Sequence, residues 1–262
     1  MSDDTNRYAL MMEAYAEVKS ETEESRPTRP IPARPALSQV LADFDPMPDE
    51  ALFLGVASDE LPVLLNLHDS IPGPLLIIGD SGSGKTSLLQ VIARAAERMH
   101  EPEKVQFGAL TNHPDEWSGF DEIPNSVGIF PIYHRASEDF ILSLASWAHG
   151  NKSSRQSVLL LLDDLETVPG MEMDAVQNLR WLLLRGPSRR VWPIITLSSD
   201  RISDMEPWLD AFRTRIFGNM RNTNHINKLD VEHAHLESLS SGSEFALGEG
   251  DHWLRFSIPE LD

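Results

Sequence analysis

Eight consecutive residues have the types and the spacing of a loop that binds phosphate. They read GDSGSGKT, from Gly79 to Thr86, and they fit the pattern G-x-x-x-x-G-K-[ST] without a gap. The three glycines permit backbone angles and close approaches that a Cβ atom would prevent. Backbone amides can then surround phosphate oxygens, assisted by the N-terminus of the following helix. Lys85 would bring a positive charge to the outer phosphates, and the hydroxyl of Thr86 would bind Mg²⁺.

The residues on either side supply the strand and the helix that such a loop requires. LLII at 75–78 is typical of a buried strand, and SLLQVIARAAERM continues a helix to about Met99. A glycine-rich turn without a ligand is the alternative, and it would not need this context. We predict a P-loop that binds ATP with Mg²⁺ through Gly79, Asp80, Ser81, Gly82, Ser83, Gly84, Lys85, Thr86 and Ser87.

Two acids follow a second apolar strand. VLLLL at 158–162 is a continuous apolar run, typical of a parallel strand buried on both faces, and Asp163 and Asp164 come directly after it. In a P-loop protein Asp163 would hold Mg²⁺, and Asp164 would orient or deprotonate the attacking water. Many ATPases have glutamate at the second position. Because aspartate is one methylene shorter, we expect slow turnover, with Glu166 as a possible substitute. A pair of acids in an exposed turn is the alternative interpretation.

A third strand would lie between the other two. P-loop ATPases of the additional-strand class insert one strand between the P-loop strand and the acidic strand, and VWPIITL at 191–197 fits that role. Its end would place a polar side chain near the γ-phosphate. Ser198, Ser199 and Asp200 are the candidates, and we assign this catalytic role to Ser199. An ordinary polar strand end explains the same residues equally well.

Arginines are concentrated after the acidic strand. An arginine that reaches a neighbour's nucleotide couples the subunits of ring ATPases. Arg213 and Arg215, at the start of a predicted strand, have the best spacing for this role, and we assign it to Arg215. Surface ion pairs in an acidic protein are the alternative. The arginines of this region are Arg180, Arg185, Arg189, Arg190, Arg201, Arg213, Arg215 and Arg221.

Strands and helices alternate from about residue 50. This alternation implies an α/β fold with a parallel sheet and right-handed crossovers. We predict strands at 52–56, 63–67, 75–78, 105–110, 127–133, 158–162, 191–197 and 215–220. We predict helices up to Met99, from Ser137 as the N-cap to about Trp147, at 174–185 and near 204–212, and a loop at 111–126.

The net charge of −19 is concentrated near the two ends of the sequence. Residues 1–60 carry 13 acids and five bases, and residues 230–262 carry eight acids and one base. Such acidity keeps a protein soluble and repels nucleic-acid phosphates, which makes DNA a weaker candidate for the cargo. Solvated acidic surfaces are the simplest interpretation. An acidic tail that docks on a basic partner is the alternative.

Residues 1–36 have the composition of an arm. Helical spacing at 7–25 precedes four prolines within about ten residues, which favour an extended linker. The chain has no cysteine, and no apolar run approaches the roughly 20 residues that span a bilayer. We therefore expect an arm at 1–36, an ATPase domain at 37–262, no membrane insertion and a cytoplasmic location.

These motifs together resemble the FtsK/HerA family of P-loop motor ATPases, in particular the ATPase domains of the type VII secretion motor. The resemblance covers about residues 50–258. LLLLDDLE matches the acidic strand, ITLSSDR resembles the family's LATQR, FRTRIFG its RIxF strand, and FALGEGDHWLRF its LLGRGDMLY segment. The resemblance implies a RecA-like (additional-strand) P-loop NTPase fold and a homo-oligomer, in particular a hexameric ring.

The sequence departs from the family at the site itself. Ser199 and Asp200 stand where the family has Thr-Gln, and Asp164 stands where it often has glutamate. Our main prediction is an ATP-hydrolysing motor that works in a ring on an undefined protein or DNA cargo. One alternative is a degenerate subunit that binds ATP as an assembly switch with little turnover. Another is an AAA+-like loader or signalling ATPase.

Overall fold

The computed structural model describes residues 34–151, 155–229, 231, 234–249 and 252–262. A compact unit extends from Pro35 to Asp262. The predicted helix at 7–25 and nearly all of the arm at 1–36 lie outside the described residues.

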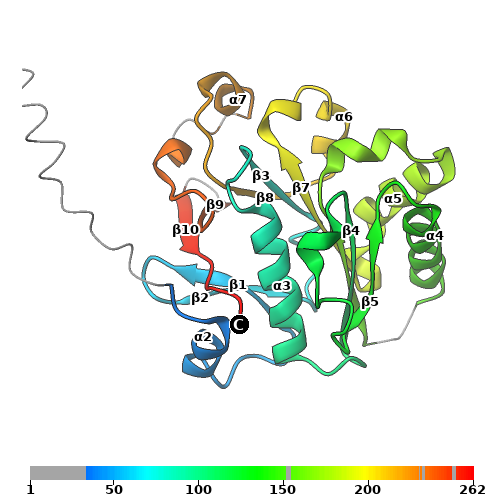
Figure 1. Ribbon diagram of the computed structural model, residues 1–262, viewed down its shortest axis with the longest axis horizontal. Helices are drawn as coiled ribbons and strands as arrows, with labels where there is room; N and C mark the ends of the chain where they lie inside the picture. Colours follow the sequence, from blue (N-terminus) through cyan, green and yellow to red (C-terminus); the bar gives the residue numbers. More distant parts are fainter. Residues whose placement is uncertain (1–33, 152–154, 230, 232–233, 250–251) are drawn as a thin grey trace, which may run out of the picture. The chain divides into compact units, whose positions relative to one another are not determined.

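The unit is built on one ten-stranded sheet (Figure 1). The strand order is β2-β1-β10-β9-β8-β3-β7-β6-β4-β5. The strands are β1 (Ala51–Ala57), β2 (Pro62–Asn66), β3 (Leu75–Gly79), β4 (Val105–Thr111), β5 (Ser126–Pro131), β6 (Ser157–Leu162), β7 (Val191–Ser198), β8 (Thr214–Phe217), β9 (Glu244–Glu249) and β10 (His252–Ser257).

Six neighbouring strands, from β8 to β5, are parallel. As predicted, β7 lies between the P-loop strand β3 and the acidic strand β6. The register pairs Gly79 with Ser198 on β7, and Leu162 of β6 with Ile195. Because the carboxyl ends of parallel strands meet at one edge, the P-loop and the two acids are brought to the same edge of the sheet.

The other four strands extend the predicted parallel sheet with antiparallel pairs. β8 pairs antiparallel with β9, β9 with β10, β10 with β1 and β1 with β2. Only a few residues separate β1 from β2 and β9 from β10, and so short a connection can join only antiparallel neighbours. The sheet is therefore parallel at its centre and on one side, and antiparallel on the other.

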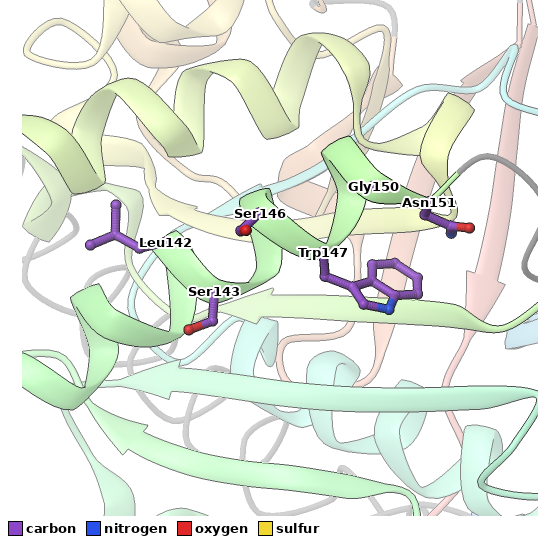
Figure 2. A pocket seen from close by; sticks show the side chains of 6 residues that line it. All are labelled: Leu142, Ser143, Ser146, Trp147, Gly150 and Asn151. Carbon is purple, nitrogen blue, oxygen red and sulfur yellow. The ribbon is translucent and has the colours of Figure 1, made fainter.

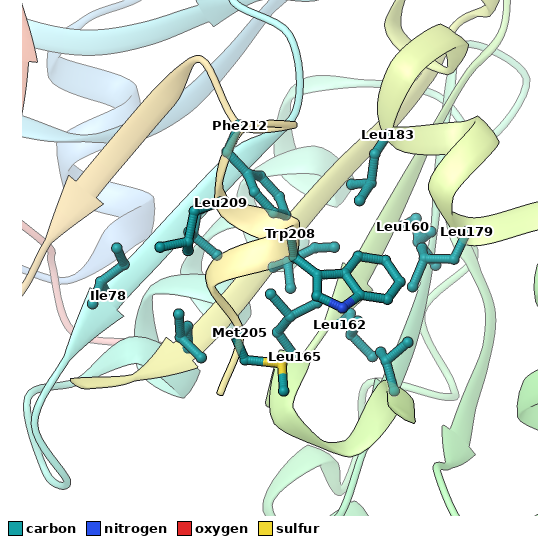
Figure 3. Close-up of a cluster of buried hydrophobic side chains, with 14 of the residues drawn as sticks. Ile78, Leu160, Leu162, Leu165, Leu179, Leu183, Met205, Trp208, Leu209 and Phe212 are labelled. Atoms are coloured by element: carbon teal, nitrogen blue, oxygen red, sulfur yellow. The ribbon is translucent and has the colours of Figure 1, made fainter. Parts of the chain in front are cut away.

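Helices cover both faces of the sheet (Figure 1). α2 (Leu37–Asp43) and α3 (Lys85–Met99) contribute to one buried cluster, together with alternate residues of β3 such as Leu75 and Ile77. α4 (Arg135–Gly150), α5 (Met173–Arg185), α6 (Glu206–Leu209) and α7 (Thr223–Lys228) contribute to the other. Figure 3 shows the Trp208 indole of α6 among leucines of β6 and α5. These two apolar layers hold the strands, and with them the strand ends that carry the site residues, in place.

Three predicted elements differ from the structure by about three residues at one end or both. α4 begins at Arg135 with His134 as N-cap, and Ser137 instead donates its hydroxyl to the carbonyls of Ile132 and His134. The helix expected near 204–212 is limited to Glu206–Leu209, because Pro207 has no amide to donate and suits only the first turn. The strand expected at 215–220 ends at Phe217, since its partner β3 ends where the P-loop begins.

Candidate nucleotide-binding site

A pocket of about 510 Å³ opens at the carboxyl edge of the parallel strands. The P-loop forms one wall, and the other walls are formed by residues after β4 and β6, by the last residue of β7 and by Gly242 before β9. The lining residues are Ser81, Gly82, Gly84, Lys85, Thr86, Ser87, His113, Glu116, Asp163, Asp164, Glu166, Ser198 and Gly242.

Two glycines of the loop adopt left-handed backbone angles. Gly82 has φ +76° and Gly84 has φ +94°, a region in which a side chain is strained. A Cβ atom on Gly84 would also lie 2.8 Å from backbone atoms of Gly242. Gly84 is the N-cap of α3, so the loop delivers the first turn of that helix to the pocket.

The backbone amides of the loop fall into two groups. Asp80 donates to the carbonyl of Asn219 at 3.0 Å, and Ser83 donates to the carbonyl of Asp80 at 3.1 Å. Within the described part of the chain, the amides of Ser81, Gly82 and Gly84 have no such acceptor. Amides of this kind bind phosphate oxygens, and these three residues line the pocket. The loop therefore fits a phosphate chain.

The side chain of Asp80 connects the loop to residues that follow β7 and β8. Its carboxylate accepts hydrogen bonds from the Ser199 hydroxyl and from the Arg221 amide, the latter at 2.9 Å. Ser199 is nearly fully buried and is not among the residues that line the pocket, whereas Ser198 is. Of the three polar residues at this strand end, Ser198 is therefore the one that lines the pocket, while the Ser199 hydroxyl is bonded to Asp80 of the loop. The catalytic role assigned to Ser199 stays a prediction.

Lys85 lines the pocket and is held over the loop. Its ammonium group donates to the carbonyls of Gly79 and Asp80, at 3.1 Å each. A phosphate chain on the loop amides would lie close to this charge. The position suits the predicted role toward the outer phosphates.

A chain of hydrogen bonds joins the loop to the acidic strand. Thr86 Oγ1 donates to Asp163 Oδ2 at 2.9 Å, and Thr196 Oγ1 donates to Asp163 Oδ1 at 2.8 Å. The Thr196 oxygen also accepts from the Asp164 amide at 2.7 Å. Thr196 on β7 therefore holds both acids, and the contact between Thr86 and Asp163 brings together the two residues predicted to hold Mg²⁺.

The chemistry of this pair fits a hard cation. Burial raises the pKa of the Asp163 carboxyl, and hydrogen bonds from Thr196 and Thr86 lower it in part. In proteins that bind Mg²⁺ next to phosphate groups, the protein ligands of the ion are hydroxyl and carboxylate oxygens. A buried carboxylate gains more from a nearby cation than an exposed one does.

The second acid has an unusual backbone. Asp164 lies at φ +78° and precedes a short 3₁₀ helix, η2 (Leu165–Gly170). Its carbonyl accepts from the Thr167 hydroxyl at 2.7 Å, which stabilises the turn. A non-glycine residue in this region stores strain and is frequent at functional sites. The turn brings Glu166 into the pocket beside Asp164.

Sequence reasoning missed several residues of the site. Thr196 is a polar residue inside an apolar strand, a signal that could have singled it out. His113 and Glu116 fall in a segment predicted only as loop, although that segment follows a parallel strand as Asp163 does. Gly242, whose amide donates to the Ser83 carbonyl at 3.1 Å, gave no local signal, because it lies far along the chain.

None of the eight arginines is among the residues that line this pocket. Arg215 pairs in register with Leu76, three residues before the end of β3, and donates to the carbonyl of Leu209 at 2.9 Å. Arg213 is exposed and lies beside Gly73, before β3 begins. Arg190 forms an ion pair with Glu50 at 2.6 Å, as the alternative interpretation expects of individual arginines. A role for Arg215 at a neighbour's nucleotide stays a prediction.

A separate hollow of about 780 Å³ runs along α4 (Figure 2). Leu142, Ser143, Ser146 and Trp147 of the helix line it, together with Gly150 and Asn151 at the helix end. None of these side chains carries a charge, so the hollow offers no counterpart for a phosphate chain.

Comparisons with known proteins give a likeness of fold. No family model and no curated protein matches this chain. EccC of Thermomonospora curvata (ATPases 2 and 3), solved with a signal sequence peptide, superposes with a TM-score of 0.67 at 14% identity, over 90% of this chain and 45% of that one. EssC of Geobacillus thermodenitrificans (ATPases 2 and 3) gives a TM-score of 0.65 at 14% identity, over 89% and 47%. The pCW3 conjugation coupling protein TcpA with ATPgS gives 0.62 at 12%, over 87% and 70%.

At these identities the comparison concerns the fold. The predicted likeness to the ATPase domains of type VII secretion motors is confirmed at that level, as is the P-loop NTPase architecture. This chain spans less than half the length of the EccC and EssC structures. Among its described residues, no helix combines the length and the apolar character needed to cross a membrane.

Proposed function

We propose that this protein binds ATP together with Mg²⁺ and hydrolyses it. The observation that carries the proposal is the hydrogen bond of 2.9 Å between Thr86 and Asp163. It lies in a pocket lined by Lys85 and by three loop residues whose amides have no backbone acceptor among the described residues. Ser81, Gly82 and Gly84 bind the phosphates through their backbone, and Lys85 balances their charge. Thr86 and Asp163 hold Mg²⁺, which neutralises charge on the phosphates when bound.

We further propose a motor-type ATPase that works in an oligomeric ring, and the likeness of fold to solved ATPase domains supports the ATPase part of this proposal. The structures that this fold resembles include one named a type VII secretion ATPase and one named a conjugation coupling protein. We propose the same general task for this chain, with its own cargo undefined and a cytoplasmic location.

One observation favours a second function, an assembly switch that binds ATP with little turnover. Asp164 has a shorter side chain than glutamate and a strained backbone, φ +78°. A poorly placed water would leave ATP bound for long periods.

The test uses Lys85→Ala, with Lys104→Ala as a matched control. Lys104 is exposed and lies outside the lining of the nucleotide pocket. A charge-assisted contact contributes about 3 kcal/mol, so Lys85→Ala should lower the affinity for a fluorescent ATP analogue by about 100-fold. Lys104→Ala should bind the analogue with the affinity of the wild type. Equal affinity in both variants would show that the loop does not take part in binding the nucleotide.

Phosphate release by the wild type then separates the two functions. Steady release under saturating ATP and Mg²⁺ supports the ATPase. Tight binding with release no faster than in Lys85→Ala supports the switch.

A further inference from the structure

Glu166 has a buried carboxylate oxygen for which the described residues provide no hydrogen-bond donor. It lies on η2, two residues after Asp164, and lines the nucleotide pocket. Its Oε2 atom is buried and has no hydrogen-bond partner among the described residues. Burying a carboxylate oxygen without a hydrogen bond costs free energy, so such an oxygen in a natural protein calls for a functional explanation.

The surroundings of Glu166 raise the proton affinity of its carboxylate. Burial raises the pKa of its carboxyl, the negative charge of Asp164 raises it further, and backbone hydrogen bonds from Glu166 itself and Ser198 and the charge of Lys85 lower it in part. A base whose pKa approaches the working pH accepts a proton efficiently. The other ionisable groups of the pocket wall are Asp163, Glu116 and His113.

Asp164 contributes in a different way. Its amide donates to Thr196 and its carbonyl accepts from Thr167, so its peptide groups fix the turn between β6 and η2. The left-handed backbone at this residue directs the chain so that Glu166 reaches the pocket wall. Unlike Asp164, Glu166 combines a place in the pocket with a buried oxygen that lacks a partner.

We infer that Glu166 is the catalytic residue that accepts the proton of the attacking water. This inference rests on the proposed ATP hydrolysis. The water oxygen forms a bond to the γ-phosphorus, and the bond from that phosphorus to the β–γ bridging oxygen breaks. The electron pair of the broken bond stays on ADP, and one proton of the water passes to Glu166 Oε2.

The experiment compares Glu166→Gln with Asp164→Asn, each isosteric with the residue it replaces. Both variants should bind ATP like the wild type. Glu166→Gln should lower kcat by about 10²- to 10⁴-fold, the usual contribution of a positioned base, whereas Asp164→Asn should lower it less than about tenfold.

A pH profile distinguishes a catalytic role from a structural one. Wild-type kcat should fall on the acid side as the carboxylate of Glu166 becomes protonated, and this limb should vanish in Glu166→Gln. Glu166→Asp keeps a carboxylate, so it should keep the limb at a reduced rate. A structural defect would lower kcat without changing the shape of the profile.

The possible failures are distinguishable. An active wild type in which Asp164→Asn abolishes turnover and Glu166→Gln does not would overturn the role of Glu166 and leave the ATPase standing. A wild type that binds ATP and never releases phosphate would overturn the hydrolysis itself, and the role of Glu166 with it.

Discussion

At the scale of single residues, Thr196 connects both acids of the pocket through one hydroxyl group. A hydroxyl has one proton to donate, and Thr196 gives it to Asp163 while its oxygen accepts from the Asp164 amide. The side chain is fully buried. The direction of these bonds means that Asp163 Oδ1 acts as acceptor, which suits an ionised ligand of Mg²⁺.

We expect Thr196→Val to weaken the Mg²⁺-dependent part of ATP binding by roughly tenfold. Valine has nearly the same shape, but it leaves the Asp164 amide without its acceptor and Asp163 without a donor. Leaving a buried polar group without its partner costs about 1–3 kcal/mol. Titration of an ATP analogue with and without Mg²⁺ measures the effect. Thr214→Val is the control, because it removes a hydroxyl that donates to the Pro72 carbonyl, outside the pocket lining. Equal Mg²⁺ dependence in the two variants would contradict the role of Thr196.

At the scale of elements, the P-loop is held between β3 and a segment that lies far along the chain. Ser241 Oγ donates to the carbonyl of Gly82 at 2.9 Å, and the Gly242 amide donates to Ser83. Residues 240–243 lead directly into β9, so the antiparallel hairpin supports the loop that binds phosphate. The packing requires Gly84 to have no side chain.

Gly84→Ala should destabilise the protein more than Gly82→Ala. Both positions have positive φ, where alanine costs about 1–2 kcal/mol. Only at Gly84 would the new Cβ meet backbone, 2.8 Å from Gly242, while nothing lies within 4 Å at Gly82. Urea unfolding of both variants measures the difference, which we expect to exceed about 1 kcal/mol. Matching losses would show that residues 240–243 do not pack on the loop as described.

α3 is fixed at its other end by His100. The ring nitrogen Nε2 lies 2.8 Å from the Ala51 carbonyl, so it carries the proton and joins the helix end to β1. Burial lowers the pKa of this imidazole below its usual range. Protonation therefore favours the unfolded chain, so this contribution to stability is complete above about pH 6.5 and is lost as the pH falls below it.

Unfolding free energies measured from about pH 5 to 8 should reveal this effect. His100→Gln, which retains a donor near Ala51 and does not titrate, should show a smaller loss of stability on acidification than the wild type does. The control His134→Gln removes an exposed imidazole elsewhere. A steeper loss in His100→Gln than in the wild type would contradict the sign that we derive.

At the scale of the whole molecule, assembly is the open part of the proposed function. The net charge of −19 opposes close approach of copies unless specific contacts offset it. A ring would supply such contacts, and it would allow an arginine of one subunit to reach the nucleotide of the next.

We predict that ATP and Mg²⁺ increase the particle mass measured by light scattering, and that Arg215→Ala lowers turnover by about 10³-fold in the assembled state. Because Arg215 also donates to Leu209 within its own chain, melting curves must show that the variant is folded. Arg213→Ala, at an exposed arginine, tests the other candidate.

Mixing Arg215→Ala with Lys85→Ala subunits gives the sharper measurement. One type of interface then combines an intact P-loop with an intact Arg215, so a shared site should partly recover activity. A protein that stays monomeric with ATP and hydrolyses it at a rate independent of both arginines would refute the shared site.

The sequence by itself determined the phosphate loop and the elements around it. The amides, Lys85 and Thr86 come from eight consecutive residues, and the strand and helix beside them show their own apolar patterns, so local information suffices. The place of β7 between β3 and β6 was also predicted and is confirmed. The predicted roles of Asp163 and Asp164 remain for experiment to test.

Only the tertiary structure decided which side chains share the pocket and which support it. Ser199 contacts Asp80 across 119 positions of sequence, Thr86 contacts Asp163 across 77, and Ser241 reaches Gly82 across 159. A local pattern states that a residue is polar and that it ends a strand. It does not state which distant group will satisfy that residue, because the partner is set by strand order and register. For that reason the sequence could name Glu166 only as a substitute, and the fold shows its buried oxygen at the wall of the nucleotide pocket.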